Sequence, residues 1–191
     1  MLALLLLKSV SVFAGQLDLN ENMWLNWTAV NETSAKFILG VNSKLYSEKT
    51  WAGVGFKAGN STTFGMKDSD IVTFILGQDS SCQDRFGQDE STFPNADAKS
   101  DIVCGTKSKE GNVYLFSWER NIETGDANDF SLKDVQDVVV LWAYGPVDND
   151  GAIQAHGNTT ADRGYVKGNM TDLKSAGAVL SFTLALALFL Y

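Results

Sequence analysis

The sequence predicts an all-β domain, a sandwich or barrel of short antiparallel strands, for the central part of this 191-residue chain. From residue 16 to about residue 169, no apolar stripe with the 3.6-residue period of a helix is sustained. Short runs rich in Val, Ile, Phe, Trp and Tyr are separated by clusters of Gly, Asn, Asp and Ser. Within the runs, apolar residues recur at every second position, as Phe37, Leu39 and Val41 do.

Seven such runs are the clearest strand candidates. Runs 70–76 and 138–142 are almost continuously apolar, which predicts central strands that are covered on both faces. Turn residues at 109–112 join two runs into a hairpin spanning 101–120, and residues 31–34 form a second predicted turn. The predicted strands are 23–30, 35–41, 51–57, 70–76, 101–106, 113–120 and 138–144.

Composition and charge limit the classes of function. A chain that is 45 % hydrophobic and 20 % charged, with only two prolines, is neither collagen-like nor a coiled coil nor disordered, and its length suits one domain. Fifteen basic and 23 acidic residues give a net charge of −8, so nucleic acid is not an expected partner. One histidine and two cysteines exclude a zinc finger, a three-histidine zinc site and an iron–sulfur cluster.

The N-terminal end has the pattern of a secretory signal peptide. Residues 1–15 contain a short apolar run followed by small residues, although Lys8, their one charged side chain, comes after that run. Removal of this segment leaves 14 basic and 23 acidic residues, a net charge of −9. We therefore expect a secreted chain whose folded domain spans 16–169.

The C-terminal end, 170–191, is predicted to be a GPI-anchor signal, with a short hydrophobic tail as the alternative. Residues 176–191 carry no charge and stop at the chain end, and they are too few for an ordinary spanning helix. Ser175 begins the best triplet of small residues, whereas Gly168 or Asn169 leaves a better spacer, so the attachment site stays open. Either reading places the protein at the extracellular face of the plasma membrane.

Secretion carries two further expectations. Because no third cysteine competes in an oxidising compartment, Cys82 and Cys104 are expected to form a disulfide. Five N-x-S/T sequons predict surface glycosylation on loops or strand edges. Their asparagines are Asn26, Asn31, Asn60, Asn158 and Asn169.

Motifs for catalysis are missing from the sequence. It contains no GxSxG, Walker, HExxH or GxGxxG pattern, and its single histidine lies beside no nucleophile motif. The DNDG sequence at 148–151 is a weak match to a calcium loop, because the distal glutamate is missing. We therefore expect a protein that is not itself an enzyme.

An ordered set of segments across residues 20–166 resembles the DOMON domain family. The first signature matches WAGVGF and GMKDSDIV, and the middle and later segments match in the same order along the chain. This resemblance implies an immunoglobulin-like β-sandwich, in agreement with the period-two pattern. The matching segments are 51–56, 65–72, 84–86, 93–97, 116–126 and 139–145, with His156 ahead of Arg163 and Gly164.

The haem-binding branch of the family, which includes the b-type cytochrome domain of cellobiose dehydrogenase, holds its haem between a methionine and a histidine. The resemblance places these ligands at Met66 and His156. Thioether and imidazole ligands fill both axial positions of the iron and suit electron transfer. The sequence has no C-x-x-C-H motif, so the cofactor would be non-covalent haem b. Without the resemblance, Met66 would be read as a core filler and His156 as a polar loop residue.

The resemblance also implies roles for other residues. Trp51 and Phe56 could line the haem, although large aromatics at alternating positions are more often core residues. Either Lys67 or Arg163 could meet a haem propionate, and the alternative for both is an ordinary exposed cation. Arg120 could form a buried ion pair that braces a corner of the fold, with Asp126 or Asp129 as its partner.

Two functions follow from these expectations. The first is a b-type cytochrome that transfers electrons at the cell surface to or from an unknown partner, a separate oxidoreductase or a transmembrane cytochrome. The second is a haem-free DOMON module that binds a sugar or another small ligand, or acts in adhesion. The presence of both Met66 and His156 favours the first.

Overall fold

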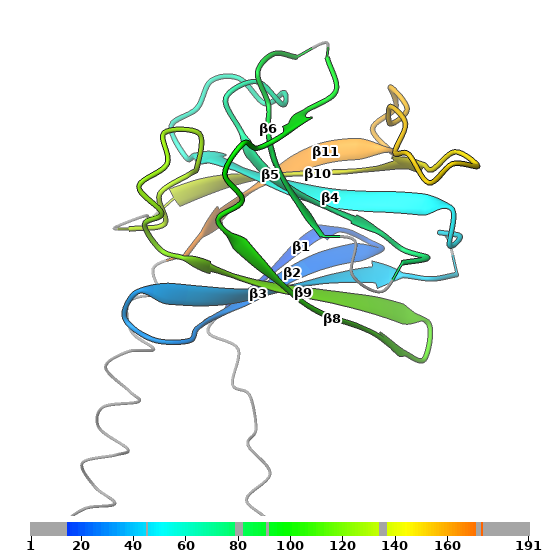
Figure 1. Cartoon of the computed structure of the whole chain (residues 1–191), viewed down its shortest axis with the longest axis horizontal. Coiled ribbons are helices and arrows are strands. Elements are labelled where there is room, and N and C mark those ends of the chain that lie inside the picture. The colour runs from blue at the N-terminus through cyan, green and yellow to red at the C-terminus, as the bar shows by residue number, and fades with distance from the viewer. Residues whose placement is uncertain are drawn as a thin grey trace, which may run out of the picture.

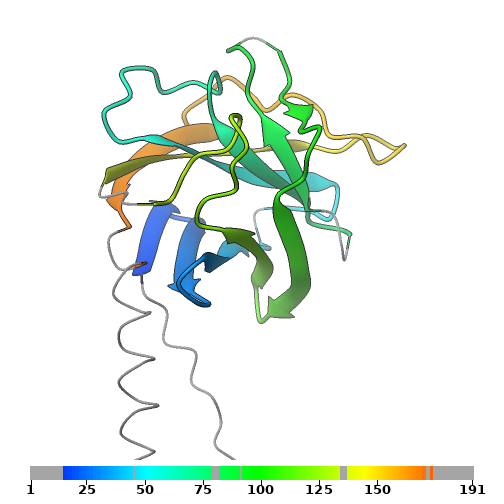
Figure 2. The same cartoon turned by 60° about the vertical axis from the view of Figure 1, so that its left-hand side comes forward.

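The computed structural model describes residues 15–44, 46–78, 82–90, 92–133, 137–170 and Leu173. In these ranges the chain forms eleven strands in two antiparallel sheets, which face each other across one core (Figures 1 and 2). The all-β sandwich expected from the sequence is therefore confirmed. The predicted signal peptide and C-terminal signal lie outside the described residues, apart from Gly15, Met170 and Leu173.

Sheet A has five strands in the order β1-β2-β3-β9-β8. The β8–β9 hairpin turns at Gly111, whose positive φ of 59° suits glycine, and it confirms the turn expected there. Its strands are β1 (Gly15–Asn20), β2 (Met23–Ala29), β3 (Ser34–Asn42), β8 (Ile102–Glu110) and β9 (Val113–Asn121).

Sheet B has six strands in the order β11-β10-β4-β5-β6-β7. As expected, the two almost continuously apolar runs are inner strands, since β5 lies between β4 and β6, and β10 lies between β11 and β4. The strands are β4 (Thr50–Ala58), β5 (Asp70–Ile75), β6 (Gln83–Phe86), β7 (Asn95–Ala96), β10 (Asp137–Pro146) and β11 (Arg163–Asn169).

The core between the sheets is built from the inward-facing side of each strand. Phe37 of sheet A stacks on Trp118 at a ring distance of 5.1 Å and also contacts Phe56 of sheet B at 5.5 Å. Phe74 of sheet B lies 5.3 Å from the same tryptophan ring. Side chains of this size dominate the burial of apolar surface, so these aromatic contacts join the two sheets.

All seven predicted strands are present, and four further strands were not predicted. The missed strands β1, β7 and β11 form sheet edges, and β6 pairs beside β7. Along β11, exposed residues alternate with half-buried ones, so the apolar signal of an edge strand is weak.

The core continues past the predicted domain end at residue 169. Met170 is 1 % exposed and Leu173 is 4 % exposed, and both belong to the core between the sheets. Within the described ranges, no helix is long and apolar enough to cross a membrane.

Truncation tests this extension of the domain. A chain ending at Asn169 loses both buried side chains and should be less stable than one ending at Lys174 by several kcal/mol, since truncating one such side chain costs about 2–5 kcal/mol. Urea unfolding of the two chains measures the difference. An Asn169→Gln change in the longer chain is the control and should leave the midpoint unchanged, because Asn169 is exposed. Equal midpoints for the two lengths would contradict the assignment.

Candidate functional site

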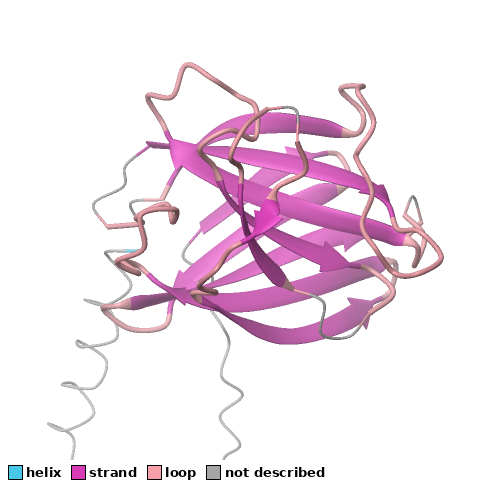
Figure 3. Ribbon diagram, turned by 45° about the horizontal axis from the view of Figure 1, so that its top comes forward, coloured by secondary structure: helices cyan, strands magenta, loops and turns pink. Residues whose placement is uncertain are grey.

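The face of sheet B that points away from sheet A is the candidate site. On β4, Ala52, Val54 and Phe56 enter the core between the sheets, so the alternate residues 51, 53, 55 and 57 point outward. This outer face is covered, because Ile71 and Leu141 are each only 7 % exposed. The loops that follow β4, β6 and β10 lie on this side of the sandwich (Figures 1 and 3).

His156 lies at one end of this face, in the loop between β10 and β11. Its ring centre is 6.4 Å from that of Trp51, and the Trp51 indole N–H donates to the Gln154 carbonyl at 2.8 Å. Gly145 pairs with Trp51, and a Cβ at Gly145 would lie 3.1 Å from the His156 Cα. The histidine segment therefore packs directly on the sheet beside Trp51.

Hydrogen bonding determines which histidine nitrogen is free. Nδ1 of His156 lies 2.8 Å from the Gly157 carbonyl oxygen, which can only accept. Nδ1 must therefore carry the proton, and in the neutral ring Nε2 keeps its lone pair. A histidine that binds a metal commonly has this arrangement, with one ring N–H held by a carbonyl and the other nitrogen available.

Met66 lies toward the other end of the face, in the loop between β4 and β5. Its carbonyl oxygen accepts from the Ser69 backbone N–H at 3.1 Å and from the Ser69 hydroxyl. A Cβ at Gly87 would fall 1.8 Å from this oxygen, so the backbone after β6 approaches as closely as only glycine permits. The main chain at Met66 is thus fixed, while its side chain is half-buried.

Lys57 holds the same loop and was not predicted as a site residue. Its ammonium donates to the carbonyls on both sides of Met66, at 3.2 Å for Gly65 and 2.7 Å for Lys67, and to the Thr63 hydroxyl at 3.0 Å. The side chain is 5 % exposed, and burial lowers the pKa of its ammonium. A single lysine within an apolar strand was the sequence signal that could have identified it.

Small residues lie on the sheet between these two loops. Gly53 and Gly55 of β4 pair with Ala143 and Leu141 of β10, and all four point outward. Glycine and alanine leave the backbone without bulky side chains at this point of the face. Both glycines are buried, and a Cβ at Gly53 or Gly55 would lie 3.1 Å from the side chain of Thr73 or Ile71, respectively, so neighbouring side chains pack closely over this part of the strand.

The other predicted site residues are not all on this face. Phe56 lies in the core against Phe37, so its expected role beside the haem is corrected to packing between the sheets. Because successive residues of a strand point to opposite faces, Phe56, five positions after Trp51, points to the face opposite that of Trp51. Lys67 and Arg163 are exposed side chains near Met66 and at the start of β11, respectively.

A cavity of about 280 Å³ also opens on the outer face, over β5 and β6. Its volume is near the lower end of the range for small-molecule pockets, about 300–1,000 Å³. Neither Met66 nor His156 lines it. The lining residues are Thr73, Ile75, Gln83, Arg85, Phe93, Gly151, Ala152 and Ile153.

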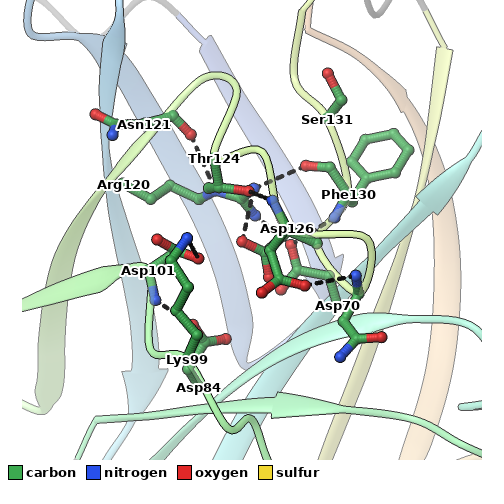
Figure 4. A network of polar contacts seen from close by, with 12 residues as sticks. Asp70, Asp84, Lys99, Asp101, Arg120, Asn121, Thr124, Asp126, Phe130 and Ser131 are labelled. Carbon is green, nitrogen blue, oxygen red and sulfur yellow. Dashed lines mark hydrogen bonds and ion pairs between the residues drawn. The ribbon is translucent and has the colours of Figure 1, made fainter.

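Arg120 forms the expected buried ion pair, but with a different main partner. Its guanidinium donates to Asp70 of β5, and both side chains are 1 % exposed (Figure 4). Asp129 is also near, at 4.0 Å, whereas no ion pair with Asp126 is found among the described residues. Burial raises the pKa of Asp70 and Asp129, and it raises that of the neighbouring Asp84 to about 7.

The expected disulfide between Cys82 and Cys104 is present and joins the segment before β6 to β8. Three sequon asparagines, Asn31, Asn60 and Asn158, are exposed in loops, as predicted for glycosylation sites. Asn169 is exposed at the end of the edge strand β11. Asn26 differs, because it lies in β2 between β1 and β3, and its Oδ1 is buried without a hydrogen-bond partner. The expected loop or edge position is therefore wrong for Asn26.

Comparisons with known proteins give both a family and a fold. The family model described as DOMON domain matches residues 19–145, which include Met66 but end before His156. No curated protein sequence matches the chain.

Two solved structures share the fold. The cytochrome domain of Myriococcum thermophilum cellobiose dehydrogenase matches with a TM-score of 0.59 at 14 % identity, over 86 % of this chain and 88 % of that one. The cytochrome b domain of Coprinopsis cinerea pyranose dehydrogenase matches with a TM-score of 0.56 at 9 % identity, over 81 % of this chain and 80 % of that one. The family match covers well over half of the sequence, and the chain belongs to the DOMON domain family.

Proposed function

We propose that this DOMON chain is a b-type cytochrome module that binds one haem b non-covalently, with Met66 and His156 as axial ligands. The observation that carries the proposal is the position of these two residues. Met66 and His156 lie in two loops anchored on the same outer face of sheet B, one by Lys57 and the other by Trp51. The small residues Gly53 and Gly55 of β4 lie between the two anchors.

The donor chemistry fits this cofactor. His156 has its Nδ1–H held by the Gly157 carbonyl, so Nε2 can bind iron. Met66 supplies a neutral, polarizable thioether from a loop whose backbone is fixed by Lys57 and Ser69. Bound haem supplies one-electron chemistry, and methionine–histidine ligation raises its reduction potential.

The residues around the ligands have supporting roles. Trp51 packs beside the His156 ring and fixes the Gln154 carbonyl, which keeps the imidazole on the sheet. Lys67 and Arg163 are exposed cations near opposite ends of the face, and either could meet a carboxylate of the haem. Neither residue is required to move a proton.

The proposed setting is the extracellular face of the plasma membrane, with a separate oxidoreductase or a transmembrane cytochrome as redox partner. The disulfide and the exposed sequons support a secretory route. Among the possible anchor sites, Ser175 is favoured over Gly168 and Asn169, because cleavage at the latter two would remove the buried Met170 and Leu173.

A second candidate, a haem-free module that binds a small ligand, is favoured by the 280 Å³ cavity. The cavity combines polar Thr73, Gln83 and Arg85 with apolar Ile75 and Phe93. This mixture resembles that of small-molecule sites, in which a few polar groups orient a ligand against an apolar wall. A sugar that saturates the haem-free protein and loses affinity in Phe93→Ala would favour this alternative.

Ligand variants test the haem proposal. The wild-type protein should bind one haem and show a sharp low-spin spectrum when reduced, with little binding of carbon monoxide. His156→Ala should lose haem or become high-spin, because a thioether alone binds iron weakly. Met66→His should keep a low-spin haem with a lower potential, since histidine stabilises the oxidised iron relative to methionine.

The matched control for Met66→His is Ala58→His, which adds an imidazole at the exposed end of β4 and should leave spectrum and potential unchanged. Absorption spectra, a redox titration and a melting curve are recorded for each variant. A colourless protein that takes up no haemin, or identical spectra in both folded ligand variants, would contradict the proposal.

Lys57→Met tests the positioning of Met66. The change keeps the aliphatic stem but removes the three hydrogen bonds of the ammonium, so the loop that carries Met66 should loosen. We expect haem affinity to fall roughly tenfold, equivalent to about 1.4 kcal/mol, with a greater high-spin fraction. Lys36→Met removes an exposed lysine of sheet A and is the control. Equal haem dissociation constants in the two variants would exclude this role for Lys57.

A further inference from the structure

Three carboxylates meet at one end of the sandwich, on the inward side of sheet B. Asp70 begins β5, Asp84 lies on the neighbouring strand β6, and Asp129 belongs to the loop between β9 and β10. Each offers one oxygen, and these oxygens lie within 4.8 Å of one another. Figure 4 shows Asp70 and Asp84 with the surrounding polar groups.

In Asp70 and Asp84, the two aspartates that lie on strands, one carboxylate oxygen already accepts hydrogen bonds. Asp70 Oδ2 accepts from Arg120 and from the Phe130 backbone N–H at 3.0 Å, and Asp84 Oδ2 accepts from the Asp101 backbone N–H at 2.9 Å. These bonds fix the two carboxylates and orient their second oxygens.

One further oxygen of each carboxylate accepts no hydrogen bond among the described residues, although Asp129 Oδ2 lies 4.0 Å from the Arg120 guanidinium. Asp70 Oδ1, Asp84 Oδ1 and Asp129 Oδ2 are buried without a hydrogen bond among the described residues. Asp70 is 2 % exposed and Asp84 is 3 % exposed. Buried acceptors are rarely left unpaired, because desolvation without a compensating interaction is costly. Three such oxygens at one place indicate a bound group that interacts with the lone pairs of oxygen atoms, as a metal cation does.

The local charge indicates the sign of that ligand. Within the described residues, Arg120 is the cation in ion-pair range of the cluster, with Asp70 and with Asp129. Lys99 is held by Asp101 at 2.8 Å, and its side chain is 57 % exposed. When all three carboxylates are ionised, they and the one guanidinium carry two net negative charges in a buried region, which one divalent cation would neutralise.

We propose that Asp70, Asp84 and Asp129 bind one calcium ion, which joins β5 and β6 to the loop between β9 and β10. Calcium takes oxygen ligands at about 2.3–2.6 Å, so two of its ligands can lie up to about 5 Å apart, which accommodates the separations here. Water supplies the remaining ligands. The nearby charge of Arg120 opposes the ion, which points to the weak affinity of extracellular modules, about 10⁻⁴–10⁻³ M. The site does not depend on haem.

Direct binding and thermal unfolding of the full-length protein test the proposal. After treatment with a chelator, the protein is dialysed against radioactive calcium at pH 7.5 and should bind one ion per chain. At tenfold excess over the dissociation constant, CaCl₂ should raise the melting temperature by about 3–6 °C. NaCl at matched ionic strength is the salt control, and MgCl₂ tests the choice of ion, with a smaller shift expected.

The variant Asp84→Asn makes the test specific. Without calcium it should melt at or above the wild-type temperature, because a buried negative charge has been removed. With calcium the order should reverse, since the variant cannot bind the ion. Asp129→Asn is the second variant, so that failure of one to fold does not end the test. Asp150→Asn, in the exposed DNDG loop, is the control and should keep the full response.

Stoichiometric calcium binding that both cluster variants lose, with the control unaffected, supports the site. No calcium binding by the wild-type protein would overturn the proposal and leave protons as the neutralising species. An equal loss in Asp150→Asn would place the ion in the other loop, and an equal response to magnesium would overturn the assignment to calcium.

Discussion

The buried ion pair between Asp70 and Arg120 is the interaction on which the arrangement of the two sheets depends. It joins β5 of sheet B to β9 of sheet A at one end of the sandwich, where both side chains are 1 % exposed. Loss of either partner would strand the other charge in the interior, at a cost of about 3–5 kcal/mol. Asp70 also accepts from the Phe130 backbone, so the same carboxylate fixes the loop after β9. Since Asp70 follows Met66 by four residues, this anchor also determines where the loop between β4 and β5 ends.

Strand β4 separates the core from the candidate site. Its inward residues, Ala52, Val54 and Phe56, fill the interior, while Trp51 and Lys57 on the other face hold the two loops. The strand is buried on both faces, as β5 is, although the sheets are antiparallel and could leave one face in water. The loops that cover the outer face therefore take the place of a third layer. They also make this face the part of the molecule where a ligand can be enclosed.

The sequence predicted most inner strands well, because their apolar period is strong. It missed three of the four edge strands, β1, β7 and β11, where exposed polar residues weaken that period. The alternation of side chains between the two faces of a strand would have predicted more of the site. Trp51 and Lys57 are six positions apart and share a face, whereas Trp51 and Phe56 are five apart and cannot. The same alternation places Asp70 on the inward face of β5, together with Val72 and Phe74, and so predicts a charged side chain in the core. That Asp84 and Asp129 join it could not be predicted, because the contact depends on strand pairing and on the path of a loop.

The fold and the ligand chemistry are specified by different parts of the chain, so similarity of fold to the two cytochrome domains does not by itself indicate the same ligand. A β-sandwich core requires only that apolar residues alternate in the paired strands, so very different sequences can build it, and identities of 9–14 % are compatible with the same architecture. Met66 and His156 lie in loops that contribute little to that core. A DOMON sandwich could therefore keep its strands and exchange its ligand. The haem proposal thus depends on two local features. The Gly157 carbonyl selects the tautomer of His156, and the Lys57 ammonium donates to the carbonyls on both sides of Met66.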